Sequence, residues 1–455
     1  MKIFPLSGKD DPSMLFSGED LRRLIVPLVL EQALMATISV ANTMMVASVG
    51  ETAVSAVSLV ETINILLVNI FAAMTTGGAV VTAQYLGRRE QENAGLAARQ
   101  LLYTVLLVSL GIATLSLIFH NSILNAVFPG VEPIVMEYSR VYFLITALSF
   151  PFLSIYDSSA ALLRTIGNSQ TALKTSLLMN IINIGGNALL ILVLRLGVEG
   201  AAIATLFARI IGAIVMVAAI KKPHELLRVP SLRKWQWDRD MVRRILHIGV
   251  PSGLENGMFQ AGKILIQSLV ASLGTVSITA NAVAGNLANF ETIPGTAICL
   301  AILIVAGRCV GAREYGQARY YVRRLMSFCI LSLLAMAGFM LLFRFFFIGS
   351  YSLSQETSNL VMQLFLLHSA FCVIFWPLSF ALPNALRAAG DARFSMIFST
   401  FSMLVFRIAF SYLLVLKFHM GVMGVWWAMF IDWIARSTAF VLRYRSNQWE
   451  KKGFL

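Results

Sequence analysis

The chain carries one pattern twice, with the second copy 224 residues after the first. The segment VASVG at 46–50 returns as VASLG at 270–274, and GRRE at 87–90 returns as GARE at 311–314. Two further pairs follow in the same order: LRxxG at 163–167 and 386–390, and GVxG at 197–200 and 421–424. The duplication predicts two homologous halves, an arrangement typical of transporters that hold a substrate between repeated bundles.

Composition places both copies in a membrane. Hydrophobic residues make up 58% of the 455 residues and charged residues only 13%, which is more apolar surface than a soluble core can cover. A transmembrane helix needs about 20 mostly apolar residues. We count twelve such stretches, six in each copy, and expect an all-α membrane protein. They lie near 22–48, 52–80, 95–119, 135–160, 170–195 and 198–220, and near 243–272, 276–306, 321–347, 358–385, 394–417 and 422–444.

The basic residues predict the orientation of these spans. The net charge of +13 comes largely from lysines and arginines in every second loop, so we attribute it to membrane topology and not to nucleic-acid binding. By the positive-inside rule, both termini and the central loop are cytoplasmic. Membrane lipids are the expected surroundings.

Six is an even number, so the second copy enters the membrane from the same side as the first. The repeat is therefore parallel, with a pseudo-two-fold axis along the membrane normal. We expect an N-terminal lobe at 1–220, a basic cytoplasmic linker at 221–240 and a C-terminal lobe at 241–455.

The sequence gives no indication of an enzyme, a metal site or a cofactor. Its four cysteines, Cys299, Cys309, Cys329 and Cys372, lie in or beside apolar spans without paired metal-ligand spacing. We find no Gly-rich phosphate loop, serine elbow or metalloprotease helix.

Carboxylates inside the spans are the first candidates for function, because a charge at depth costs a few kcal/mol on insertion scales. Glu31 lies about 13 Å along its helix from the basic residues that precede the span, near the midplane. Glu255 is its counterpart in the second copy, and each follows a proline, Pro27 or Pro251, by four positions. A desolvated carboxylate favours its neutral form, so either glutamate could exchange a proton for a cation. The alternative is a hydrogen bond that only fixes helix packing.

Other charged residues within spans could likewise either handle an ion or substrate or only fix helix packing. Glu61, Glu291 and Asp432 are candidates for ion or substrate handling, and Lys263 could instead form a structural pair with Glu291 or Asp432. His368 could carry a proton or be simply hydrogen-bonded within its span.

Carboxamides form a further candidate group. Asn180, Asn183 and Asn187 share one helical face, and Gln260 lies near the face of Glu255. Their amides could coordinate an ion or contact a substrate, or could join helices by hydrogen bonds.

The duplicated motifs and their order resemble the multidrug and toxin extrusion (MATE) transporters over nearly the whole chain. The resemblance implies a V-shaped pair of lobes and a bacterial inner-membrane antiporter, acting as a monomer, that exchanges H⁺ or Na⁺ for small amphipathic, cationic substrates. Pro27 matches the family's span-one proline, associated with helix bending, and Pro251 is its repeat mate. Many members carry aspartates where this chain has Asn42 and Asn187.

We therefore predict a secondary-active exporter that works by alternating access. Two alternatives stay open: a flippase for lipids or lipid-linked sugars with a related architecture, and a membrane receptor without transport.

Overall fold

The computed structural model describes residues 14–222, 224–232, 236–349, 351 and 353–452. This part of the chain is helical and has no strand. It divides into two compact units, one up to Gly253 and one from Leu254. The dividing point lies inside a single helix, α8 (Arg239–Ala271). The expected division into lobes at 1–220 and 241–455 stays a prediction, and residues 223 and 233–235 of the expected linker lie outside the described ranges.

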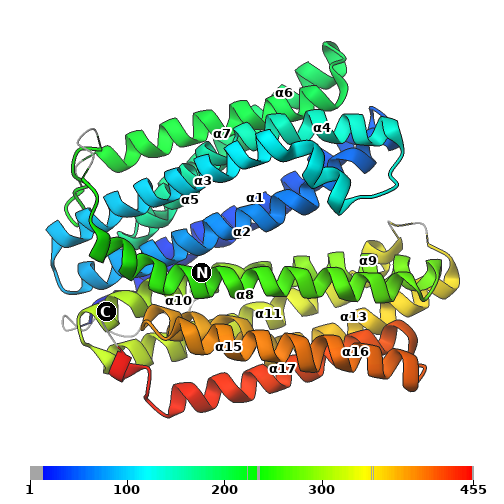
Figure 1. Ribbon diagram of the computed structural model, residues 1–455. Helices are drawn as coiled ribbons and strands as arrows, with labels where there is room; N and C mark the ends of the chain where they lie inside the picture. Colours follow the sequence, from blue (N-terminus) through cyan, green and yellow to red (C-terminus); the bar gives the residue numbers. More distant parts are fainter. Residues whose placement is uncertain (1–13, 223, 233–235, 350, 352, 453–455) are drawn as a thin grey trace. The chain divides into compact units, whose positions relative to one another are not determined.

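In the first unit the long helices run alongside one another (Figure 1). They are α1 (Gly18–Ala47), α2 (Glu51–Gly87), α3 (Gln91–Val127), α4 (Pro133–Leu148), α5 (Phe150–Thr165), α6 (Ser169–Asn187) with the π-helical turn η1 (Ala188–Val193), and α7 (Gly197–Lys221). The first begins at a capping box, in which the Ser17 hydroxyl accepts from the Asp20 amide at 3.1 Å. The expected span at 135–160 is the pair α4 and α5, bent by 46°.

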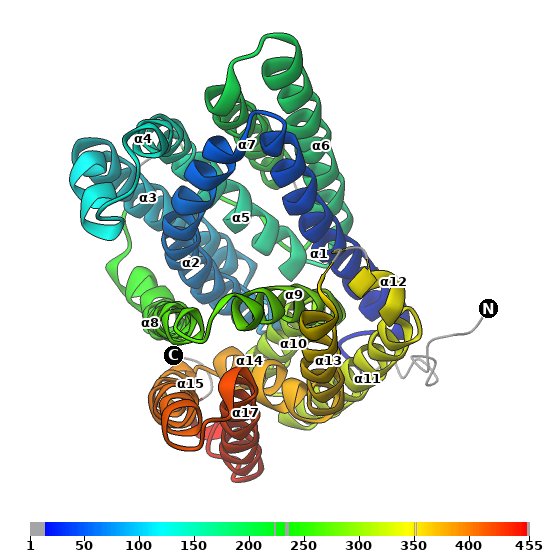
Figure 2. The same ribbon diagram turned by 90° about the vertical axis from the view of Figure 1, so that its right-hand side faces the viewer.

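The second unit contains the remainder of α8 and the helices that follow it (Figure 2). They are α9 (Thr275–Glu291), α10 (Ile293–Gly311), α11 (Tyr315–Leu342), α12 (Arg344–Gly349), α13 (Gln355–Trp376), α14 (Leu382–Ala388), α15 (Ala392–Ser402), α16 (Phe410–Tyr412) and α17 (Gly421–Arg445). Short π-helical turns join several of these: η2 (Pro377–Ala381), η3 (Met403–Ala409) and η4 (Leu413–Lys417). A short 3₁₀ helix, η5 (Glu450–Lys452), ends the described chain.

By length and composition, nine described helices are apolar enough to cross a membrane, or ten if the bent pair α4 and α5 is one span. Two further long helices, α1 and α8, occupy the expected spans 22–48 and 243–272. Helices thus lie at all twelve expected positions.

The two copies share backbone conformation as well as sequence. Arg89 and Arg313, in matching turns, have φ of 62° and 61°. Gly167 and Gly390, which end the two LRxxG motifs, have φ of 84° and 85°. Glycine adopts a positive φ without a clash of Cβ, so it suits the position that ends the helix in both motifs.

Candidate functional site

In the first unit, Glu31 forms an ion pair with Arg164. Glu31 is buried within α1, and its Oε1 lies 2.5 Å from an Arg164 terminal nitrogen at the end of α5. Its second oxygen is buried and has no hydrogen-bond partner among the described residues. The pair joins the two helices and gives the buried carboxylate a permanent counter-ion.

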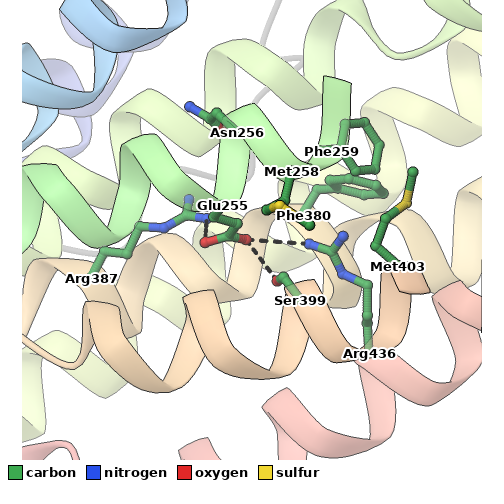
Figure 3. Close-up of a pocket in the computed structure, with 9 residues that line it drawn as sticks. All are labelled: Glu255, Asn256, Met258, Phe259, Phe380, Arg387, Ser399, Met403 and Arg436. Carbon is green, nitrogen blue, oxygen red and sulfur yellow. Dashed lines mark hydrogen bonds and ion pairs between the residues drawn. The ribbon is translucent and has the colours of Figure 1, made fainter. Parts of the chain in front are cut away.

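In the second unit, Glu255 is held by two arginines and a serine (Figure 3). Its Oε2 lies 2.6 Å from Arg387, its Oε1 lies 3.6 Å from Arg436, and Ser399 donates a hydrogen bond to Oε1 at 2.7 Å. The carboxylate is 6% exposed, so these contacts replace most of its water.

The two ion pairs are related by the duplication, but their surroundings differ. Glu31 and Glu255 are repeat mates, and so are Arg164 and Arg387, the arginines of the two LRxxG motifs. Arg436 has no basic counterpart, because the equivalent position of α7 is Gly212. The second copy therefore has a cation beside its glutamate that has no counterpart at the equivalent position of the first copy.

A cavity of about 200 Å³ opens beside Glu255. Its lining combines the ionic cluster with apolar and aromatic groups. These residues are Glu255, Asn256, Met258, Phe259, Phe380, Arg387, Ser399, Met403 and Arg436. The lining contains two arginines and one carboxylate, a formal charge of +1.

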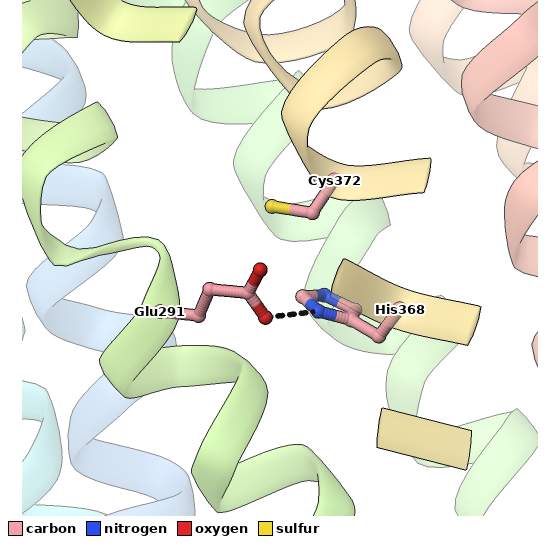
Figure 4. A group of neighbouring side chains, drawn as sticks. All are labelled: Glu291, His368 and Cys372. Carbon is pink, nitrogen blue, oxygen red and sulfur yellow. Dashed lines mark hydrogen bonds and ion pairs between the residues drawn. The ribbon is translucent and has the colours of Figure 1, made fainter. Parts of the chain in front are cut away.

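Glu291, His368 and Cys372 form a second buried cluster in the same unit (Figure 4). Glu291 Oε2 lies 2.9 Å from His368 Nδ1 and accepts a hydrogen bond from Ser369 at 3.1 Å. The carboxylate, imidazole and thiol donor atoms lie within 4.8 Å of one another. Such a donor set could hold zinc, although the hydrogen bond from histidine to glutamate already explains the proximity of these two groups.

The expected pairing of Lys263 with Glu291 or Asp432 is wrong. Asp432 accepts a hydrogen bond from Ser402 and lies 3.8 Å from Arg407, while Glu291 contacts His368. Lys263 instead lies over the Phe259 ring, with Nζ 5.1 Å from its centroid. His368 and Arg407, and not a lysine, are therefore the basic partners of Glu291 and Asp432.

Three of the candidate asparagines meet in the first unit. Asn187 donates hydrogen bonds to Asn42 at 3.0 Å and to Asn183 at 3.3 Å, and Asn183 donates to Thr205 at 3.1 Å. The network ties α6 to α1 and α7. Asn180, one turn away, has a buried amide nitrogen without a partner in the described chain.

The remaining candidates lie apart from these groups. Glu61 accepts hydrogen bonds from Tyr142 at 3.1 Å and from Asn64 at 3.3 Å. Gln260 is half-buried in α8, and Pro27 and Pro251 are buried inside α1 and α8.

Sequence reasoning missed the cationic partners of the glutamates. The basic-loop pattern explains Arg164 and Arg387 as charges that indicate topology, and it does not include Arg436. An available signal is the position of Arg436 inside a predicted span, one helical turn after Asp432, where a second charge also requires a partner.

The MatE family model matches residues 27–189 and 251–413, two ranges that are again 224 residues apart. Among individual proteins, the chain is 26% identical to the uncharacterized transporter YisQ of Bacillus subtilis, over 94% of each chain. It is 24% identical to the probable multidrug resistance protein NorM of Thermotoga maritima, over 96% of this chain and 94% of that one.

Solved structures show the same fold. A MATE protein in a bent conformation superposes with a TM-score of 0.87, at 20% identity and 96% coverage of both chains. A Pyrococcus furiosus transporter of the MOP superfamily, described by the reverse polarity of its binding pocket, gives a TM-score of 0.86 at 20% identity, with 94% of this chain and 96% of that chain covered.

Proposed function

This chain belongs to the MatE family of multidrug efflux transporters, and we propose on that basis that it is a secondary-active exporter in which inward flow of H⁺ or Na⁺ drives small amphipathic molecules out of the cell. It is a multi-pass membrane protein. We propose that it acts as a monomer in the bacterial inner membrane, as the family resemblance implies. Both termini are then cytoplasmic, because the basic residues follow the positive-inside pattern.

The observation that carries the coupling is the contrast between Glu291 and the other two buried glutamates. Glu31 and Glu255 each contact an arginine, which is always charged. Glu291 is fully buried, and in the described chain its hydrogen-bond partners are His368 and Ser369, neither of which is permanently charged. This carboxylate can therefore gain or lose a cation without leaving an arginine unpaired, as a coupling site requires.

Coupling then follows from differential affinity. A cation bound at Glu291 removes a buried negative charge and stabilises the conformation in which that charge is most poorly solvated. The bound cargo stabilises the other conformation. Exchange results because each ligand shifts the same equilibrium in the opposite direction.

The charge of the cargo is a separate question. The family resemblance predicts cationic substrates, and this stays a prediction. The lining of the cavity beside Glu255 has a formal charge of +1, which would repel a cationic substrate bound there.

The test is efflux from proteoliposomes, with pH and sodium gradients imposed separately. We expect Glu291→Gln to reduce gradient-driven norfloxacin or ethidium efflux at least 10-fold while substrate binding persists. Glu19→Gln, which changes an exposed carboxylate of α1, is the matched control and should leave efflux unchanged. Full gradient-driven efflux by Glu291→Gln would remove Glu291 from the mechanism.

A further inference from the structure

We propose that the cavity beside Glu255 binds the anionic group of an amphipathic organic molecule, a carboxylate or sulfonate on an aromatic body, and that Arg436 is the anchoring cation. The proposal rests on the exporter function, because it names a class of substrate for that exporter. The proposal concerns the binding of a ligand to one cavity at equilibrium, so it can be tested without a transport assay.

The charges around the cavity favour an anion. Arg387 and Arg436 line it against one carboxylate, Glu255. Two further cations approach the Phe259 ring that forms part of its wall, Lys263 at 5.1 Å and Arg407 at 5.6 Å. Arg407 has Asp432 as a partner, whereas no carboxylate of the described chain lies within ion-pair distance of Lys263. The site thus keeps an excess of positive charge within a hydrophobic unit, which an anionic ligand would offset.

Arg436 is the cation with most capacity for a new partner. It is 3% exposed, and its contact with Glu255 at 3.6 Å is longer than the 2.6 Å contact made by Arg387. The same terminal nitrogen donates to the Ser379 carbonyl at 3.3 Å, and Nε has no hydrogen-bond partner among the described residues. A buried guanidinium has five donors and is stabilised by bidentate acceptors, so a ligand carboxylate would satisfy donors that Glu255 leaves open.

The apolar lining fits the rest of such a ligand. Arg436 lies 4.7 Å from the centroid of the Phe380 ring, which meets Phe259 edge-on at 6.0 Å. Met258 and Met403 complete this wall, and methionine adapts readily to ligand shape (Figure 3). A volume of about 200 Å³ is below the usual range of roughly 300–1,000 Å³ for drug-sized ligands, so the cavity suits a small aromatic acid or the acidic end of a larger molecule.

Glu255 acts in this arrangement as an internal competitor. Its carboxylate occupies the position that a ligand carboxylate would take against Arg387 and Arg436. Neutralising Glu255 would leave both arginines available and raise the affinity for anions. A purely structural role for the cluster predicts no such gain.

The experiment is calorimetric titration of the purified full-length protein with three ligands that share one ring system: naphthalene-2-carboxylate, its methyl ester and naphthyl-trimethylammonium. We expect the carboxylate to bind at least 10-fold more tightly than the other two. Arg436→Gln should abolish that preference, Arg436→Lys should retain part of it, and Glu255→Gln should tighten carboxylate binding several-fold. Arg443→Gln is the matched control, because it removes another paired arginine from α17, one bound to Asp391 at 2.7 Å outside the cavity lining.

Equal affinity for the three ligands, a preference for the ammonium, or no binding of any would overturn the proposal. If Arg436→Gln does not fold, the proposal is still tested by the affinities of the wild-type protein for the three ligands and by the carboxylate affinity of Glu255→Gln. A carboxylate preference in a protein that shows no gradient-driven efflux of norfloxacin or ethidium would contradict the exporter and leave the anion site standing.

Discussion

At the scale of single residues, the two repeated ion pairs should be energetically coupled. Removing one member of a buried pair costs about 3–5 kcal/mol, because the other charge is left without a partner. Removing both members should therefore cost less than the sum of the single changes. For Glu31 with Arg164 and for Glu255 with Arg387, we expect coupling energies of about 1–3 kcal/mol in double-mutant cycles, measured from thermal unfolding in detergent.

The exposed pair Glu19 and Arg23 provides the reference for this measurement. Its side chains are 68% and 65% exposed, and a surface pair at this helical spacing contributes about 0.3–0.5 kcal/mol. Coupling at Glu31 no larger than this reference would mean that Arg164 does not compensate the buried charge.

The site could be predicted from the sequence only in part. Periodicity and hydropathy place Glu31, Glu255 and Glu291 within apolar spans, and a charge there requires a partner. The identity of that partner depends on helix packing between segments more than 75 residues apart, as in Glu291 and His368. The spacing of residues along one helix does not identify a partner on another helix, so the sequence could not show that His368 and Arg407, and not Lys263, are the partners of Glu291 and Asp432.

At the scale of helices, α2 and the first half of α8 meet through backbone. A Cβ added at Gly77 would lie 2.3 Å from the Ile245 carbonyl oxygen and 2.8 Å from the Gly249 amide nitrogen. Such distances are shorter than any real contact, and the backbone cannot move aside as a side chain can. Small residues at these positions let membrane helices approach closely.

We therefore expect Gly77→Ala to destabilise the protein by about 1–3 kcal/mol, as overpacking does, or to prevent its assembly. Thermal unfolding monitored by size-exclusion chromatography would measure the effect. Gly111→Ala is the control, because a Cβ added there meets no atom within 4 Å. Equal stability of the two variants would show that α2 and α8 can separate without cost.

At the scale of the whole molecule, the duplication explains how much of the fold could be predicted. The repeated sequence motifs predict turns of the same conformation in both copies, and the length of each apolar stretch predicts the approximate bounds of its span. The segment 135–160 is predicted as one span, and Pro151 within it indicates a bend, because proline removes a backbone hydrogen bond to the residue four positions earlier. Its bend of 46° lies at Ser149, whose hydroxyl accepts a hydrogen bond from Arg209 at 2.6 Å.

That break makes the membrane topology testable. If α4 and α5 together form one span, three spans separate Glu132, before α4, from Glu225, after α7, and these residues face opposite sides of the membrane. If the pair is a re-entrant loop, both residues face the same side. The basic loops predict that Glu225 is cytoplasmic.

Introduced cysteines can decide between these arrangements, since Glu132 and Glu225 are both exposed and three of the four native cysteines are buried. We expect a membrane-impermeant thiol reagent added to intact cells to label Glu132→Cys, and to label Glu225→Cys only after the membrane is opened. The unmodified protein gives the background from Cys299, which is partly exposed. Labelling of both variants from the same side would make α4 and α5 re-entrant and place all later helices in the opposite orientation.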